Sequence, residues 1–313
     1  MFNTLDDREL SQDILIELTQ GLFPGYKVNY KQAINHNENP FNQLLEVARQ
    51  KLVQDHGVIL LWLAGIEEAP DWFKETLSDI SVQYQAFSYI LDDDLQKHVS
   101  QYTQDIENCQ KVLLVAHSQG NFYGNEAWRW VYQKTIDSQP LNKLKVMGMV
   151  SVATPASHIG EPLAHEGDQQ QITRYLTLNN DLIINVIRQS IIDPLPGNLQ
   201  NSSDSSDWKN HSFIDAYASG TPSQQVLANH IQSVAYSLES LPLERDPLVS
   251  SALASAGYDP AAHTLDIEFA SSGSVYRYYE VPEPIYHELV NAESIGRYYN
   301  LAIRGQYPSK RLL

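Results

Sequence analysis

The chain has 313 residues, 42% of them apolar, which is enough for one domain of about 200 to 250 residues and a smaller second one. This composition is that of an ordinary globular protein and excludes a disordered or collagen-like chain. The formal net charge of -17 repels phosphate groups, so nucleic acid is disfavoured as a partner for most of the chain.

The first residues, MFNTLDDRELSQD, are acidic and polar and lack the basic and apolar regions of a signal peptide. No apolar run approaches the roughly 18 residues that a membrane-spanning helix requires. We therefore expect no transmembrane segment and a cytoplasmic protein by default, with export by a machine that needs no signal peptide left open. The single cysteine, Cys109, forms no internal disulfide and offers no metal site, so neither a metal nor a cofactor is expected.

Along the chain, residues 41–55 place apolar side chains at helical spacing, and Gly57 then begins the apolar run GVILLWLAG, which has the length of a strand. A second apolar stretch at 83–92 precedes a polar segment at 93–108 that we expect to be helical. The two runs predict buried strands joined by about 20 residues.

Three more apolar runs follow at 111–116, 145–154 and 174–178, and the spacing predicts an amphipathic helix at 223–241. Strands that are apolar throughout and alternate with helices are typical of a parallel sheet covered on both faces. We therefore predict an α/β fold for a domain of residues 1–242, with a largely parallel sheet flanked by helices.

The stretch KVLLVAHSQGNFYGNE runs from an expected strand through Ser118 directly into an expected helix. On such a turn the serine hydroxyl stands clear, and the helix N-terminus supplies positive potential. We expect crowding two positions either side of the serine, where Ala116 and Gly120 are small. The stretch resembles the nucleophile elbow of the α/β-hydrolase superfamily, with Ala116 in place of the usual first glycine. The resemblance implies an α/β-hydrolase fold, lipase- or esterase-like activity and Ser118 as nucleophile.

A serine nucleophile needs an imidazole base, and the imidazole needs a carboxylate to orient it. In the superfamily the chain order is serine, acid, histidine. Asp181 follows the apolar run that ends at Leu178 and is the predicted acid, although an N-cap of a following helix is the alternative role. Asp204 and Asp207 compete with it, in the stretch SSDSSDWKN, whose composition predicts an exposed flexible loop.

Ten histidines are candidates for the base. Eight precede the acid or belong to the C-terminal segment: His36, His56, His98, His117, His158, His165, His263 and His287. Of these, His117 should point away from the hydroxyl and support the turn. His230 falls in the amphipathic helix, where a core-edge role is more common. His211, in WKNHSFIDAY, is therefore the predicted base, and bacterial α/β-hydrolases with a similar elbow carry a similar His-Ser-Phe segment.

The oxyanion formed by attack on a carbonyl needs backbone N–H donors. The elbow itself supplies the amide of Gln119, and the resemblance implies a second donor after the early strand, for which we select Ile66, with Gly65 next. An ordinary glycine at the end of a strand is the alternative. The apolar segment 182–197 is expected to be a buried helix, with an apolar wall for an acyl chain as a second hypothesis.

Residues 248–313 follow a linker with prolines and differ in character. LDIEF and VYRYYEV alternate around a serine-glycine turn and predict a β-hairpin, and two short helices should follow. The segment resembles the KTSC domain, a small α+β module. The shared residues are Ser250, Ser251, Gly257, Tyr258, Asp259, Gly273, Tyr276, Tyr278, Val281, Pro282, Tyr286, Ser294, Gly296, Tyr298 and Asn300. The resemblance implies no particular chemistry, so we expect a protein partner or a packing role. Eight acidic residues from Asp246 onward outnumber five bases, which disfavours nucleic acid.

Two classes of function follow. The first is a serine hydrolase that cleaves a carboxylic ester, with an acyl ester or a lipid as substrate, through an acyl-enzyme. The second is a binding protein whose hydrolase fold is catalytically silent and whose KTSC module carries the function. The ordered set of Ser118, Asp181 and His211 favours the first.

Overall fold

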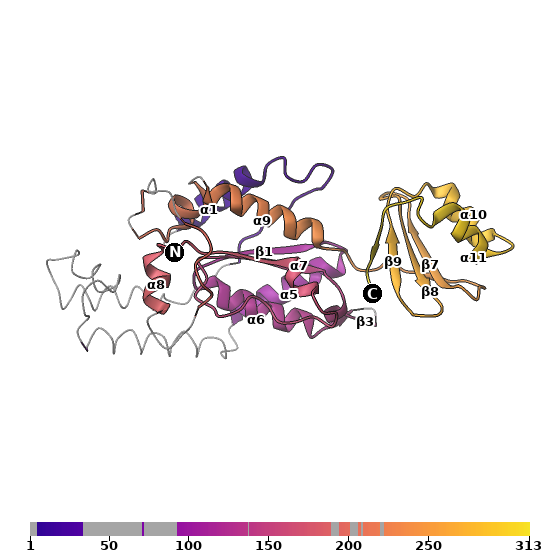
Figure 1. Cartoon of the computed structure of the whole chain (residues 1–313), viewed down its shortest axis with the longest axis horizontal. Helices are drawn as coiled ribbons and strands as arrows, with labels where there is room; N and C mark the ends of the chain where they lie inside the picture. Colours follow the sequence, from indigo (N-terminus) through magenta and orange to yellow (C-terminus); the bar gives the residue numbers. More distant parts are fainter. Residues whose placement is uncertain are drawn as a thin grey trace.

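The computed structural model describes residues 5–33, 71, 93–136, 138–188, 194–200, 206–207, 209–219 and 222–313. The helix expected at 41–55, the strands expected at 57–65 and 83–92, and Ile66 lie outside these residues. Figure 1 shows helices on both sides of a sheet, and a second, smaller group of strands and helices at one end.

The elements of the first group are α1 (Leu5–Thr19), α5 (Asp93–Glu107), β1 (Val112–His117), α6 (Gly120–Tyr132), β2 (Thr135–Ile136), β3 (Gln139–Pro140), the 3-10 turn η1 (Leu141–Lys143), β4 (Met147–Val152), α7 (Asp168–Ile172), β5 (Thr173–Leu176), α8 (Leu182–Arg188), the π-helical turn η2 (Phe213–Ala218) and α9 (Ser223–Ser237). No helix in the described ranges is long and apolar enough to cross a membrane.

The three apolar runs around 111–116, 145–154 and 174–178 form β1, β4 and β5. They make a parallel sheet in the order β1-β4-β5, with Val112 opposite Met147 and His117 opposite Val152. Every residue of the central strand β4 is buried, which explains why its sequence shows no polar alternation. Helix α9 packs on one face of this sheet and α5 and α6 on the other (Figure 1).

Helix α6 lies close against the sheet at Gly124. A Cβ atom at this position would lie 2.5 Å from Cε of Met149 on β4. At Gly120 a Cβ atom would meet no described atom within 4 Å. The crowding expected at Gly120 therefore falls one turn further along the helix, where α6 lies against the sheet.

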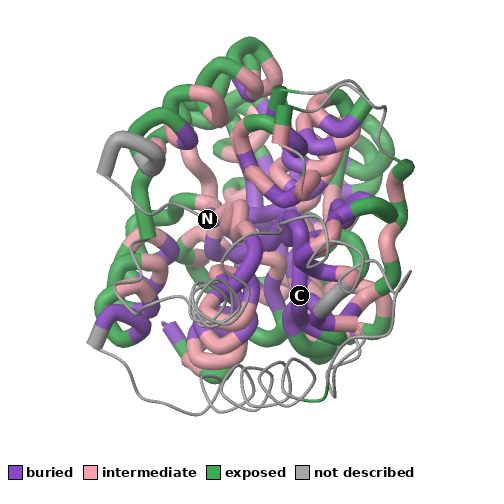
Figure 2. The backbone as a smooth tube through the Cα atoms, turned by 90° about the vertical axis from the view of Figure 1, so that its left-hand side faces the viewer, coloured by how far each residue is buried: buried purple, intermediate pink, exposed green. Residues whose placement is uncertain are grey.

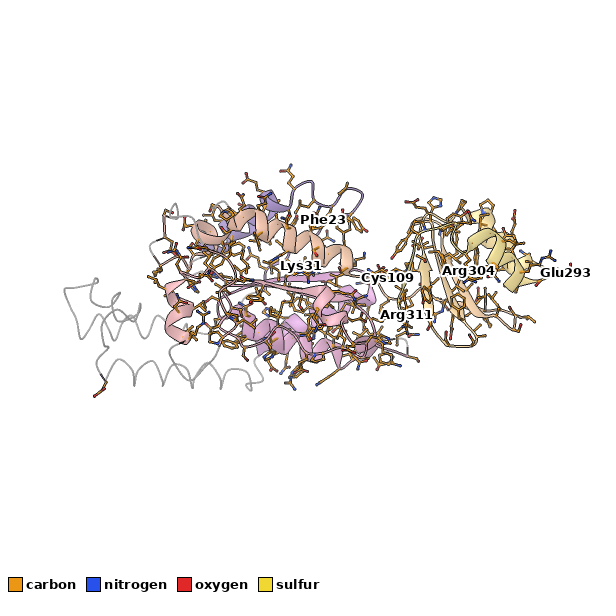
Figure 3. The ribbon with its side chains drawn as sticks, viewed as in Figure 1. Phe23, Lys31, Cys109, Glu293, Arg304 and Arg311 are labelled. Atoms are coloured by element: carbon orange, nitrogen blue, oxygen red, sulfur yellow. The ribbon has the colours of Figure 1, made fainter. Side chains whose placement is uncertain are left out.

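The core of the first group fills the space between the sheet and its helices, and Figure 2 shows the buried segments running through the middle of the molecule. Trp128 on α6 is wholly buried, and the hydroxyl of the neighbouring Tyr132 donates to the backbone oxygen of Met147. Cys109 is exposed in the turn between α5 and β1 (Figure 3).

The second group comprises β6 (Asp246–Pro247), β7 (Leu253–Asp259), β8 (Thr264–Phe269), β9 (Val275–Tyr278), α10 (Glu283–Asn291), α11 (Ile295–Tyr298), the π-helical turn η3 (Tyr299–Ile303) and β10 (Ser309–Arg311). The strands form an antiparallel sheet in the order β10-β9-β8-β7-β6. Strands β8 and β9 are the two segments expected as a hairpin, with Leu265 opposite Tyr278. The sheet has its own apolar core, which includes Ile267 and Leu289.

The two groups meet beside Glu239, which follows α9. The amide of Glu239 donates to the backbone oxygen of Lys145, just before β4, so this contact lies at the amino ends of the parallel strands. The carboxylate of Glu239 pairs with Lys310 at 2.7 Å, and Arg277 donates to the backbone oxygen of Leu241 at 2.9 Å. The second group is thus attached at the amino ends of the parallel strands, and Ser118 follows the carboxyl end of one of them.

Candidate active site

Ser118 lies immediately after β1, on a turn whose backbone is held from two sides. Its φ of 53° is in the left-handed region, which serine adopts rarely and at a cost of about 1 to 3 kcal/mol. The Ser118 amide donates to the oxygen of Val152 at 3.0 Å, and the Ser118 oxygen accepts from both the backbone amide and Nδ2 of Asn121. Because the wholly buried Asn121 side chain also donates to Val152, the turn is fixed against β4.

The structure brings Ser118, His211 and Asp181 into one hydrogen-bonded chain. Oγ of Ser118 lies 2.9 Å from Nε2 of His211, and Nδ1 of His211 lies 2.9 and 3.0 Å from the two carboxylate oxygens of Asp181. The residues are 4%, 5% and 0% exposed, in that order. Because a carboxylate only accepts, Nδ1 of His211 carries the hydrogen, which leaves Nε2 to accept from the serine hydroxyl.

Asp181 is positioned by backbone and side-chain donors. Its amide donates to the oxygen of Leu178 at the end of the β5 run, and its Oδ1 accepts from the amide of Ile184 at 3.0 Å. The carboxylate therefore contacts the ring of His211 and also caps the first turn of α8, so the two roles weighed for it do not exclude each other. Its Oδ2 accepts a further hydrogen bond, of 2.7 Å, from the hydroxyl of Tyr217.

Asp207, weighed above as the competing acid, binds the backbone at and beside His211. Its carboxylate accepts from the amides of Lys209, His211 and Ser212 at 2.7 to 3.1 Å. Burial raises the pKa of Asp207, but the hydrogen bonds from these three amides lower it by more. The pKa is therefore below its ordinary value. The stretch expected to be a flexible loop is thus tied down where it carries His211, whereas Asp204 lies outside the described residues.

His117 links the end of β1 to the loop that carries His211. Its Nε2 donates to the backbone oxygen of His211 at 2.8 Å, and its ring lies beside those of His211 and Phe213. Burial, together with the neighbouring imidazole of His211, lowers the pKa of His117 well below 6.5. A neutral His117 therefore ties the end of β1 to the backbone of His211.

Of the two residues selected as oxyanion donors, the structure describes Gln119 and not Ile66. Gln119 is buried at the N-cap of α6, and its Nε2 has no hydrogen-bond partner among the described residues. Ile66 lies outside them. His230 lies on α9, and its Nδ1 is likewise buried with no partner in the part that the structure describes. In the same ranges no three His, Cys, Asp or Glu side chains are grouped to hold a metal ion.

Apolar side chains of α8 belong to the core. Ile183, Ile184 and Ile187 are buried and join the main hydrophobic cluster, as expected for a buried helix. Sequence reasoning did not single out Tyr217, the donor to Asp181. It is one of 18 tyrosines, and nothing in FIDAY marks it; only its burial and its contact with Asp181 do so.

Comparison with known proteins identifies the C-terminal segment. Residues 249–307 match the KTSC domain family. An uncharacterized protein of Stutzerimonas stutzeri is 43% identical over 65 residues, which are 21% of this chain and 90% of that protein. A lysine--tRNA ligase of a Nostoc species is 44% identical over 55 residues, which are 18% of this chain and 10% of the ligase. A crystal structure of a KTSC domain protein from Yersinia pestis is 33% identical, covers 23% of this chain and 100% of its own, and has a TM-score of 0.22. The chain therefore belongs to the proteins that carry a KTSC domain.

Proposed function

We propose that residues 1–242 form an α/β-hydrolase domain and that the protein is a serine hydrolase of carboxylic esters. The observation that carries this proposal is the buried chain of hydrogen bonds from Ser118 through His211 to Asp181. A satisfied surface serine or a core histidine needs no such ordered set, whereas acyl transfer does. The left-handed backbone at Ser118 and its place before α6 support the same reading.

In the proposed reaction Oγ of Ser118 attacks the ester carbonyl carbon while Nε2 of His211 takes the hydroxyl proton. The imidazolium then gives this proton to the departing alkoxide, so an alcohol leaves and the acyl group stays on Ser118. A water molecule then gives a proton to His211 and attacks the acyl carbon. The bond from that carbon to Oγ of Ser118 breaks, the carboxylic acid leaves, and the imidazolium returns the proton to Oγ. Asp181 holds the imidazole in the required tautomer and stabilises its positive charge in both halves of the reaction.

The negative oxygen of the tetrahedral intermediate requires donors, and we propose the amides of Gln119 and Ile66. The Gln119 amide lies at the N-terminus of α6, where the helix dipole adds positive potential. Loss of one such donor costs about 3 kcal/mol of transition-state stabilisation. The substrate class in this proposal is an acyl ester or a lipid, and the KTSC domain, attached at the other end of the sheet, binds a protein partner.

Labelling with a fluorophosphonate probe tests the proposal, because only an activated serine reacts. We expect stoichiometric labelling at Ser118 and turnover of p-nitrophenyl esters in a series from acetate to palmitate. Ser118→Ala should abolish both. The matched control is Ser157→Ala, because the exposed Ser157 Oγ also lies near a histidine, 3.4 Å from Nδ1 of His158.

A protein that neither reacts at Ser118 nor hydrolyses any ester of the series would instead support the alternative, a silent fold that acts through its KTSC domain. Equal loss of labelling in Ser157→Ala and Ser118→Ala would also contradict the proposal, since it would show that the probe does not report the Ser118 site.

A further inference from the structure

Tyr217 is wholly buried on η2 and its hydroxyl lies between two groups near the acid. Oη is 2.7 Å from Oδ2 of Asp181 and 3.0 Å from the amide nitrogen of Leu178. The amide can only donate and the carboxylate can only accept, so the direction of both bonds is fixed. Tyr217 accepts from the backbone at the end of the β5 run and donates its only hydroxyl hydrogen to Asp181.

This bond shares an acceptor oxygen with the base. Oδ2 of Asp181 receives the Tyr217 hydroxyl and lies 2.9 Å from Nδ1 of His211. Oδ1 receives the Ile184 amide and lies 3.0 Å from the same Nδ1. A third donor disperses the charge of the carboxylate and prevents its rotation away from the imidazole. A more dispersed charge stabilises an imidazolium less.

We propose that Tyr217 is a positioning residue of the triad, which locks the Asp181 carboxylate against His211 and sets the pH at which the base becomes active. The inference rests on the proposed hydrolase function and adds to it a residue that touches neither the substrate nor the nucleophile. Its action passes entirely through Asp181.

The neighbours of His211 keep a constant charge near neutral pH, so a shift of the acid limb in a Tyr217 variant can be assigned to His211. Three titratable residues of the described part bond to His211 itself: His117, Asp181 and Asp207. Three more lie one contact away, since Tyr217 bonds to Asp181, Lys209 to Asp207 and Asp215 to Ser212. Burial and the nearby Asp181 raise the pKa of Tyr217 well above 10, so it stays a neutral donor. The lowered pKa values of His117 and Asp207 keep the first neutral and the second ionised near neutral pH.

The test compares Tyr217→Phe with Tyr132→Phe in the full chain. Tyr132 is a matched control, because its buried hydroxyl also accepts from one backbone amide, that of Met147 at 3.1 Å, and donates to an oxygen at 2.5 Å. Its acceptor is a backbone carbonyl and not a triad carboxylate. Both variants should lose similar stability to heat, so a difference in activity between them reports the contact with Asp181.

For Tyr217→Phe we expect the acid limb of kcat/KM to move to higher pH by about half a unit or more. Without the hydroxyl donor, the negative charge of the Asp181 carboxylate is less dispersed and stabilises the imidazolium of His211 more strongly. We also expect kcat to fall about tenfold or more with little change in KM, because the carboxylate loses its fixed orientation. Tyr132→Phe should leave the limb and kcat unchanged. Coincident limbs for Tyr217→Phe and the wild type, or equal shifts in the two variants, would overturn the inference.

A second measurement needs no tyrosine substitution. In proton NMR of the wild-type chain, the buried hydroxyl of Tyr217 should be visible and its resonance should move as His211 titrates. A hydroxyl resonance that ignores this titration overturns the inference even if the variant does not fold. Wild-type protein without turnover or fluorophosphonate labelling overturns the hydrolase proposal itself, and the two failures are thus distinguishable.

Discussion

Two buried aspartates, one in each group of elements, have similar surroundings and different partners. Asp181 and Asp266 are both 0% exposed, and each accepts a backbone amide, from Ile184 and Leu243 respectively. Asp181 then faces the imidazole of His211. Asp266 instead faces the guanidinium of Arg277, with a pair of bonds of 2.7 and 2.8 Å.

The difference lies in whether the partner can release a proton. An imidazole exchanges its proton near neutral pH, whereas a guanidinium does not. Burial lowers the pKa of Arg277, but Asp266 raises it, and the net result is a pKa above the ordinary value. The Asp266 pair is therefore a structural ion pair, through which Arg277 joins the KTSC domain to Leu241, while the Asp181 pair moves a proton in the proposed reaction. The burial of a carboxylate therefore does not by itself distinguish a structural ion pair from a candidate catalytic residue.

The largest expected effect is that of Asp181→Asn on turnover. The side-chain amide of the introduced asparagine can turn its NH₂ group towards Nδ1 of His211, which leaves the imidazole in the wrong tautomer. The value of kcat should therefore fall about 10⁴-fold. The acid limb of the remaining activity should move to lower pH, because a neutral amide stabilises the imidazolium less. Measurement of kcat/KM against pH with a soluble ester checks both effects. A variant that keeps a tenth of wild-type turnover would remove Asp181 from the mechanism.

Asp266→Asn should act on stability and not on turnover. It leaves the buried Arg277 charge without its bidentate partner, with Glu239 at 3.7 Å, so the free energy of unfolding should fall by about 3 to 5 kcal/mol. Urea unfolding measures this change. The control Glu293→Gln, an exposed acid of the same domain (Figure 3), should change it by less than about 0.5 kcal/mol. A loss of ester turnover in folded Asp266→Asn protein would contradict the division between the two clusters.

The sequence carried much of the candidate site because its chemistry is local and ordered. A tight turn from an apolar strand into a helix is visible in KVLLVAHSQGN, and the structure has Ser118 at that corner. The order of serine, acid and histidine then limited the partners to few residues. The α/β-hydrolase fold as a whole and Ile66 stay predictions, since the early apolar runs lie outside the described residues.

The sequence could not reveal contacts that depend on how segments pack. Tyr217 is 36 residues from Asp181, and no periodicity relates the two. Asp207 lies in a serine-rich stretch that composition assigns to a loop, yet three amides enclose its carboxylate. Strand β7, LASAGYD, was not predicted because small residues replace the usual branched ones; a Cβ at Gly257 would clash with the backbone oxygen of Glu244.

A smaller effect is expected from His117 at low pH. Its pKa is about 6.5 in the unfolded chain and well below that in the folded protein. Between the two pKa values the unfolded chain binds a proton that the folded chain does not. Stability is therefore lost as pH falls below about 6.5, by up to about 1.4 kcal/mol per pH unit from this residue. The lowered pKa of His230 acts in the same direction.

His117→Gln should flatten the dependence of unfolding free energy on pH below about 6.5, because glutamine does not titrate. The control is His287→Gln, since His287 is exposed on α10 and pairs at the surface with Glu283. Urea unfolding at several pH values gives the slopes. Equal slopes for His117→Gln and the wild type would show that His117 takes up a proton in the folded protein.

The last prediction concerns separation of the two regions. A chain that ends at Pro242 keeps Ser118, Asp181 and His211 and loses the domain attached at the amino ends of the strands, so kcat/KM for p-nitrophenyl acetate should stay within about twofold of the full chain. Its stability should fall, because Glu239 loses Lys310 and Arg277. Activity is measured at a temperature where circular dichroism shows the shortened chain folded. A folded but inactive chain would mean that the KTSC domain completes the active site, and the comparison between the two aspartates would then fail.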